Sequence, residues 1–229
     1  MKNIITYLRL MAVVITVSAL NIENVRGQQL HLGLYGDPLV GWISSDADNI
    51  SGGGLRAGFS GGLAINYYFG RNYAFSTGLS YLKTGGVQSS TQETTFEFTN
   101  FQTTVAPGDK AIYSASYIII PAGLRLRTNQ IGYLAIFTDA GLDAGFLNKG
   151  TISIPAAGIE KEAGSNEISK FHLGYHLQAG TEYSIGGSTL LIVGVGYESG
   201  FTDVTIDNTG QPADKSVVRL IRFRLGIFF

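Results

Sequence analysis

The sequence predicts an all-β fold, an eight-stranded antiparallel up-and-down transmembrane β-barrel, on three observations. The chain has 31 glycines and 11% aromatic residues, whereas only 14% of residues are charged, a composition that favours strands over helix bundles. Several segments alternate between an apolar face and a face of glycine and charge. The connections between these segments alternate between short and long, which is typical of barrels that cross a membrane with strands.

Residues 1–27 are expected to be a secretory signal peptide. Lys2 and Arg9 give a positive start, residues 10–20 form an apolar run, and residues 25–27 offer a small-residue cleavage site. The pattern therefore predicts an exported protein.

A transmembrane anchor is the alternative interpretation of the same segment. The run at 10–20 is shorter than the roughly 20 apolar residues that a spanning helix needs, and Glu23 follows it. We therefore expect residues 28–229 to form the mature domain, an outer-membrane β-barrel.

Without residues 1–27 the chain keeps 13 of its 16 basic and 16 of its 17 acidic residues, a net charge of −3 that predicts no nucleic-acid partner. The absence of cysteine excludes a disulfide framework.

Eight strands account for most of the mature sequence. They are predicted at 29–43, 57–70, 73–84, 115–127, 131–146, 170–183, 189–200 and 216–229. Three connections are only a few residues long, while the other four are the longer segments 44–56, 85–114, 147–169 and 201–215. Short turns at one end and long loops at the other predict periplasmic turns and external loops, with both termini on the periplasmic side.

The last strand shows most clearly which face is which. Ile221, Phe223 and Leu225 share one face, whereas Arg222 and Arg224 share the other. The same division recurs in the strands at 115–127, 131–146, 170–183 and 189–200, where charge collects on the glycine-rich face. We therefore expect the apolar face to contact lipid and the charged face to line the lumen. Lys83 and Arg219 break the rule near the loop ends, where a lipid-facing charge costs little.

Charged side chains sealed inside an eight-stranded barrel must be paired, because burial of an isolated charge is costly. We expect Arg222 and Arg224 to pair with carboxylates of the fifth to seventh strands. Eight strands leave an interior that side chains fill, so no water-filled pore is expected. The predicted lumen ion-pair network comprises Arg125, Arg127, Asp139, Asp143, Glu182, Glu198, Arg222 and Arg224.

Aromatic residues near the strand ends predict an interfacial girdle, with ordinary strand propensity as the alternative explanation. They are Tyr67, Tyr68, Phe69, Tyr73, Phe75, Tyr133, Tyr183 and Phe229.

Several motifs resemble those of a known family. The stretch 117–125, Y-I-I-I-P-A-G-L-R, resembles the Y-x-x-I-P strand of the small outer-membrane β-barrel proteins of Bacteroidetes, the group that contains the PorT type. Further matches are 78–85, 180–183 and 197–204, and the terminal Phe229 resembles the signal read by the outer-membrane insertion machinery. The resemblance implies an outer-membrane barrel in lipid, and the PorT type implies a link to secretion or surface assembly. Ala122 and Gly123 stand where the family has bulkier residues.

The histidines do not predict a metal site or any bound cofactor. His172 and His176 share a strand face but lie about 13 Å apart, too far for one ion, so hydrogen bonding in the lumen is expected. An enzyme that modifies lipid A is the enzymatic alternative, since such barrels need a histidine with a serine and a carboxylate. Candidates near His172 are Ser165, Glu167 and Ser169. Asp139 and Asp143, also about 13 Å apart, fit ion pairing better than a glycosidase site.

The second long loop predicts a hairpin that stands above the membrane. Thr, Phe and Glu alternate over 91–101, so Phe96, Phe98 and Phe101, if exposed, could form a partner-binding edge. Packing of the hairpin on itself is the interpretation that we favour. The predicted function is a non-enzymatic structural or interaction role in the cell envelope, with small-solute transport and lipid A modification as alternatives.

Overall fold

The computed structural model describes residues 30–98, 100–164, 166–206, 208 and 214–229. The predicted signal peptide lies outside the described residues. No helix among those residues is long and apolar enough to cross a membrane.

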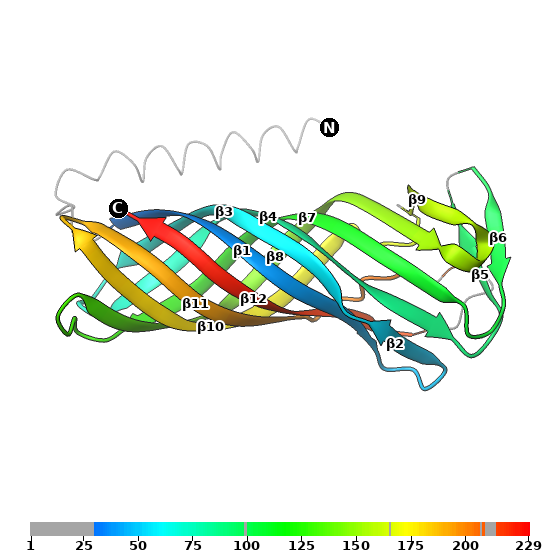
Figure 1. Ribbon diagram of the computed structural model, residues 1–229, viewed down its shortest axis with the longest axis horizontal. Helices are drawn as coiled ribbons and strands as arrows, with labels where there is room; N and C mark the ends of the chain where they lie inside the picture. Colours follow the sequence, from blue (N-terminus) through cyan, green and yellow to red (C-terminus); the bar gives the residue numbers. More distant parts are fainter. Residues whose placement is uncertain (1–29, 99, 165, 207, 209–213) are drawn as a thin grey trace, which may run out of the picture.

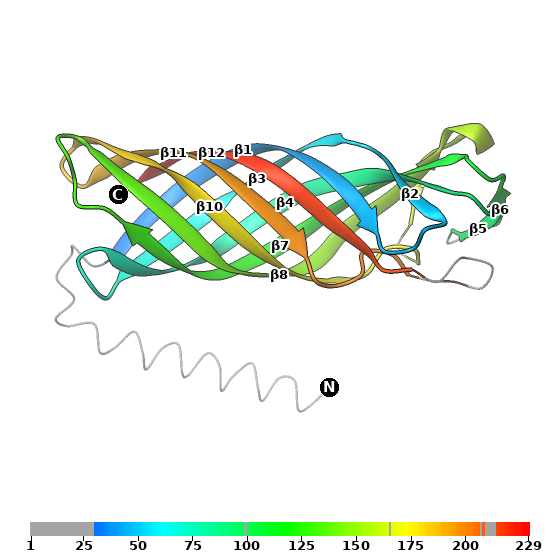
Figure 2. The ribbon, with the colours of Figure 1, turned by 90° about the horizontal axis from the view of Figure 1, so that it is seen from below.

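Eight antiparallel strands close into a barrel, as predicted (Figures 1 and 2). They are β1 (Leu30–Ser45), β3 (Arg56–Tyr68), β4 (Tyr73–Ser90), β7 (Lys110–Arg127), β8 (Leu134–Ile154), β10 (Phe171–Gly186), β11 (Thr189–Gly200) and β12 (Ser216–Phe228). Each strand pairs with its neighbours in the chain, and β12 pairs with β1 to close the ring.

The register of the strands fixes the width and tilt of the barrel. The paired residues can be followed once around the ring from Trp42 on β1, through Arg219 on β12, until they return to β1 at Leu32. The return point lies ten residues from the start, so the shear number is ten. For eight strands this shear corresponds to strands tilted by roughly 35–45° around an interior that side chains can fill.

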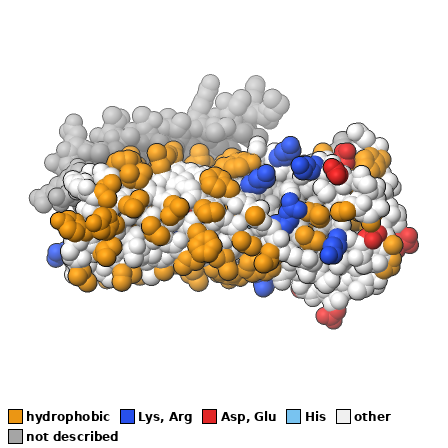
Figure 3. All heavy atoms as spheres, in the orientation of Figure 1, with side chains coloured by type: hydrophobic (Ala, Val, Ile, Leu, Met, Phe, Trp, Pro, Cys, Tyr) orange, Lys and Arg blue, Asp and Glu red, His pale blue; other side chains and the backbone are white. Residues whose placement is uncertain are grey.

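The outer surface is apolar, as the alternation predicted. Leu142, Phe146, Phe223 and Leu225 are among the many large apolar side chains exposed on it. On the face seen in Figure 3, a band of apolar side chains covers the barrel, while most Lys, Arg, Asp and Glu side chains gather toward the end that carries the long loops. A band of this kind is the surface that contacts lipid in outer-membrane barrels.

Three strands run further beyond the band than predicted. β4 continues to Ser90 instead of residue 84, β7 begins at Lys110 instead of 115, and β8 ends at Ile154 instead of 146. They stay paired with one another throughout, so the sheet continues outside the membrane. A β-bulge at Asn148, between the pairs Ser116↔Lys149 and Tyr117↔Leu147, lets one extra residue into β8.

Smaller elements lie at the loop end of the barrel. They are β2 (Ile50–Gly54), which pairs with β4; β5 (Thr94–Glu97) and β6 (Gln102–Val105), which form a separate hairpin; the 3₁₀ turn η1 (Pro155–Ala157); and β9 (Ile159–Ala163), which pairs with β8. The hairpin predicted over 91–101 is therefore present, although it forms its own two-stranded sheet.

The interior of the barrel changes character along its length. Toward the loops it is apolar, and its buried cluster includes Leu82, Tyr117, Ile152 and Leu220. Toward the short turns it is polar and charged, apart from a small apolar cluster that includes Phe137 and Phe228. The charged network therefore lies between the short turns and the apolar cluster toward the loops, which we call the apolar plug.

Candidate functional site

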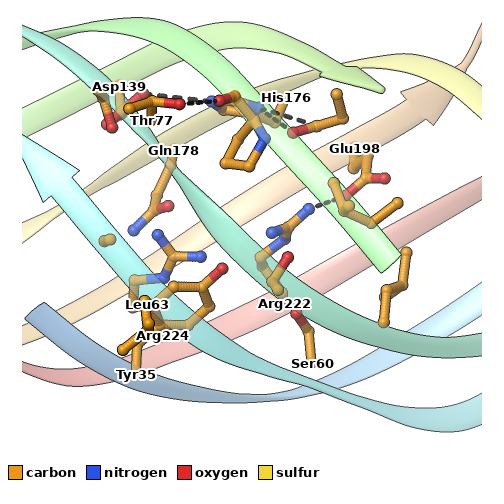
Figure 4. A pocket seen from close by; sticks show the side chains of 17 residues that line it. Tyr35, Ser60, Leu63, Thr77, Asp139, His176, Gln178, Glu198, Arg222 and Arg224 are labelled. Atoms are coloured by element: carbon orange, nitrogen blue, oxygen red, sulfur yellow. Dashed lines mark hydrogen bonds and ion pairs between the residues drawn. The ribbon is translucent and has the colours of Figure 1, made fainter. Parts of the chain in front are cut away.

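The charged lumen is the candidate site, because it gathers most of the buried ionisable residues. Alternate residues of each strand point inward, and inward glycines leave room for long side chains from neighbouring strands. Figure 4 shows these side chains converging from opposite walls of the barrel. All eight residues of the predicted network face this interior.

The first group of charges lies near the short turns. Arg125 donates from Nη2 to Glu182 Oε1 at 2.7 Å and from Nε to the same oxygen at 3.1 Å. Arg127 Nη1 lies 3.6 Å from Glu182 Oε2, and Arg125 Nη1 lies 3.7 Å from Asp139 Oδ2. Arg125 also stacks on the Phe137 ring at 3.7 Å. Two guanidinium groups therefore share the carboxylate of Glu182.

The second group centres on a histidine that was not assigned to the ion-pair network from sequence. His176 Nδ1 lies 2.9 Å from both carboxylate oxygens of Asp143, and its Nε2 lies 3.2 Å from Asp139 Oδ1. The imidazole therefore bridges two aspartates that stand four residues apart on β8. Both ring nitrogens face carboxylates, as expected for hydrogen bonding in the lumen.

The third group involves the closing strands, and here the expected partners of Arg224 were wrong. Arg222 pairs with Glu198 on the seventh strand, as expected, and His172 Nε2 lies 3.5 Å from that carboxylate. Arg224 instead binds Asp37 on β1, with Nη2 2.8 Å from Oδ2. Asp37 is fully buried and was missed, although its place at an inward position of the first strand could have revealed it.

Little space remains between the charged side chains in the middle of the lumen, although a cavity of about 190 Å³ opens at the short-turn end beside Arg127 and Glu182. The cavity among Tyr35, Asp139, His176, Arg222 and Arg224 measures about 30 Å³, which is room for about two waters. In the described part of the lumen, four arginines face five carboxylates, and a protonated His176 would make the charges equal. The arrangement is suited to holding the barrel together.

The described residues offer no metal centre. No group of three or more His, Cys, Asp or Glu among them could hold an ion.

Among the residues considered for lipid A chemistry, those that the structure describes have other partners. Glu167 accepts the Glu97 backbone N–H at 2.5 Å and the Asn208 amide at 3.0 Å. Ser169 donates to the Phe171 carbonyl oxygen, and His172 is buried beside Glu198. Ser165 lies outside the described residues. The carboxylate and the hydroxyl thus serve the fold of the loop.

The possible partner-binding edge of three exposed phenylalanines is contradicted for two of them, and packing of the hairpin, the favoured interpretation, is what the structure shows. Phe96 and Phe98 are 4% and 6% exposed, because they pack into the apolar cluster that continues above the barrel. Phe101 is 42% exposed and stacks on Phe98 with ring centroids 4.9 Å apart. The hairpin thus packs on the molecule itself.

A small apolar pocket lies beneath the hairpin. It measures about 50 Å³, and its lining includes Phe96, Val105, Tyr113 and Thr205. Burial, with Glu167 and Asp214 nearby, raises the pKa of Tyr113, so its phenol stays neutral.

Comparisons with known proteins point to one class. A sequence model of the family described as "Outer membrane protein beta-barrel domain" matches residues 23–205. No curated protein matches the chain. Among solved structures, Neisserial surface protein A is 15% identical with a TM-score of 0.50, covering 86% of this chain and 95% of its own.

Two further structures are similar to the chain. OprG from Pseudomonas aeruginosa is 10% identical with a TM-score of 0.47, covering 87% of this chain and 94% of its own. The outer membrane protease OmpT from Escherichia coli is 8% identical with a TM-score of 0.41, covering 91% and 99%. At these identities only the likeness to Neisserial surface protein A bears on the fold, and it agrees with the barrel.

Proposed function

The chain belongs to the outer membrane protein beta-barrel domain family, and on that premise we propose that it acts without catalysis, as a closed barrel that presents its external sheet to other envelope proteins. The observation that carries the proposal is the filled lumen. Paired charges and an apolar plug occupy the interior, with room for about two waters between the charged side chains. On the face seen in Figure 3, most charged side chains of the outer surface lie toward the loop end.

The hairpin β5–β6 is the part best suited to a partner. Among the described residues, β6 pairs only with β5, and its sequence Gln-Thr-Thr-Val has no charged side chain. By contrast another external edge, β9, carries Glu160, Lys161 and Glu162, and charges of this kind oppose strand addition. A partner strand could add to β6 through main-chain hydrogen bonds.

The resemblance to PorT-type barrels supports a partner in secretion or surface assembly. A photo-crosslinking residue at Gln102 should yield an adduct with an identified envelope protein, whereas the same residue at Glu162 on β9 should not. Thr104→Lys, which places a charge on the β6 edge, should abolish the adduct at Gln102. No adduct at Gln102, or one that survives Thr104→Lys, would contradict the proposal.

Single-channel recording separates this role from small-solute transport. The purified barrel should leave a planar bilayer silent, because side chains of the described residues fill the middle of the lumen and its loop end. Stepwise conductance from the folded protein would favour transport instead. Unchanged lipid A mass spectra in a deletion strain would support the absence of lipid A modification.

A further inference from the structure

At the loop end of the barrel the hydrogen-bonded wall is interrupted between β1 and β2, and we call this place the seam. β1 pairs with β3 only as far as Gly41, opposite Arg56. Above that point β2 pairs with β4 and not with β1, so residues 42–45 of β1 have a strand partner on the β12 side only.

An apolar groove of about 400 Å³ follows this seam. Leu55 and Ile221 line it and are exposed on the outer surface. Gly52 brings β2 close to β1, because a Cβ at that position would lie 2.9 Å from the Ile43 carbonyl oxygen. The complete lining is Trp42, Ile43, Gly52, Gly54, Leu55 and Ile221.

A cation stands at the edge of the groove. Arg219 is the cross-strand neighbour of Trp42 and lies on the outward face of β12, since Val218 and Leu220 point inward and are buried. Its Nε is buried and has no hydrogen-bond partner among the described residues. The guanidinium of this partly exposed arginine is therefore available to an acceptor from outside the chain.

Other basic residues mark the same level of the membrane. Lys83, Ser116 and Lys149 lie opposite one another on three adjacent strands, on the outer face. Lys170 lies near this row, because its carbonyl oxygen accepts a hydrogen bond from the N–H of Leu147, two residues before Lys149. Lys and Arg side chains gather between the apolar band and the loop end, whereas Asp and Glu lie further out (Figure 3). Cations just above the hydrocarbon match a layer of anionic head groups.

We propose that this seam is a binding site for a lipid of the outer leaflet that carries a phosphate group. One acyl chain lies in the groove against Trp42 and Ile221, and the phosphate accepts hydrogen bonds from the Arg219 guanidinium. The groove is continuous with the lipid-facing band, so a lipid enters it without leaving the membrane.

The chain's single tryptophan, Trp42, reports directly on the groove. The folded protein is placed in vesicles of phosphatidylcholine, and brominated phosphatidic acid or brominated phosphatidylcholine is added as a quencher. Phosphatidic acid should quench Trp42 with an association constant about fivefold higher, the effect of about 1 kcal/mol from one exposed ion pair. Equal quenching by the two lipids would overturn the proposal.

Variants assign the effect to the seam. Arg219→Gln should remove the preference for phosphatidic acid, and Ile221→Phe, which fills the groove, should weaken quenching by both lipids. Lys161→Gln, which removes an exposed cation on β9, should keep the full preference. An Arg219→Gln protein that retains the preference, or a Lys161→Gln protein that loses it, would overturn the site.

Two controls separate the sources of the signal. Free inorganic phosphate at millimolar concentration should not release the brominated lipid, because it lacks the acyl chain; release would show a simple phosphate site and contradict the proposal. Each variant is compared only after its folded barrel has been verified by its mobility shift on heating before electrophoresis.

Discussion

Arg224 on β12 and Asp37 on β1 form a bidentate pair across the two strands that close the barrel. Arg224 Nε lies 3.2 Å from both Asp37 oxygens, Nη2 lies 2.8 Å from Oδ2, and the two residues are 187 positions apart in the sequence. The register pairs Gly36 with Leu225 and Leu39 with Arg222, so Asp37 stands opposite Arg224. The first and last strands are therefore joined by charge as well as by their backbone ladder.

Asp37→Asn should destabilise the barrel strongly, because it leaves Arg224 buried without a counter-charge. Loss of one partner of a buried pair costs about 3–5 kcal/mol. The measurement is the free energy of unfolding in urea, for protein folded into lipid vesicles. Glu160→Gln, on the exposed edge strand β9, is the control and should change it by less than about 0.5 kcal/mol. Similar values for the two variants would contradict the structural role of Asp37.

The inward glycines are predicted to be required by close packing between strands. A Cβ at Gly180 would contact the Val193 carbonyl oxygen and lie 2.7 Å from Gly194 Cα and 2.8 Å from the Phe137 ring. Gly180→Ala should therefore lower the free energy of unfolding by about 1–3 kcal/mol.

Gly36→Ala is the matched control for this glycine. A Cβ at Gly36 would meet only the Phe59 ring, at 3.4 Å, so the substitution should change the free energy of unfolding by less than about 0.5 kcal/mol. If Gly36→Ala proved as destabilising as Gly180→Ala, crowding in the lumen would not be the reason.

Phe96→Ala should loosen the external hairpin without opening the barrel. Removal of a buried phenylalanine costs about 3–5 kcal/mol, which corresponds to an increase in local opening of at least about 100-fold. Limited proteolysis of the segment 91–109 measures this opening. Phe101→Ala removes an exposed ring that stacks on Phe98, and should accelerate cleavage by about tenfold or less. Equal acceleration would contradict the buried position of Phe96.

Phe229→Ser should impair insertion in cells while leaving the folded barrel stable. The Phe229 backbone exchanges hydrogen bonds with Leu32 at 2.8 and 3.3 Å, and these do not need its ring. The side chain is exposed at the end of the barrel, where the insertion machinery is expected to read it. Refolding into detergent micelles should be unchanged, and the amount recovered in outer membranes should fall several-fold. A matching loss in both assays would assign the ring a folding role.

The sequence by itself determined the fold class and the two faces of the sheet. Alternation with a period of two is a local property of a strand, so the outward position of Phe223 and the inward position of Arg222 followed from the residues alone. Ion pairing in the lumen could likewise be predicted, because sealed charges need partners.

The tertiary structure decided which partners meet. Arg224 binds Asp37 because closure of the barrel brings the first and last strands together, and no local pattern contains that register. Before the bulge at Asn148, the inward residues of β8 have odd numbers, as Asp143 does. After the bulge they have even numbers, as Ile152 does, and strict alternation does not predict this change. The burial of Phe96 depends on how the long loops pack over one another, a long-range property that spacing along the chain does not encode.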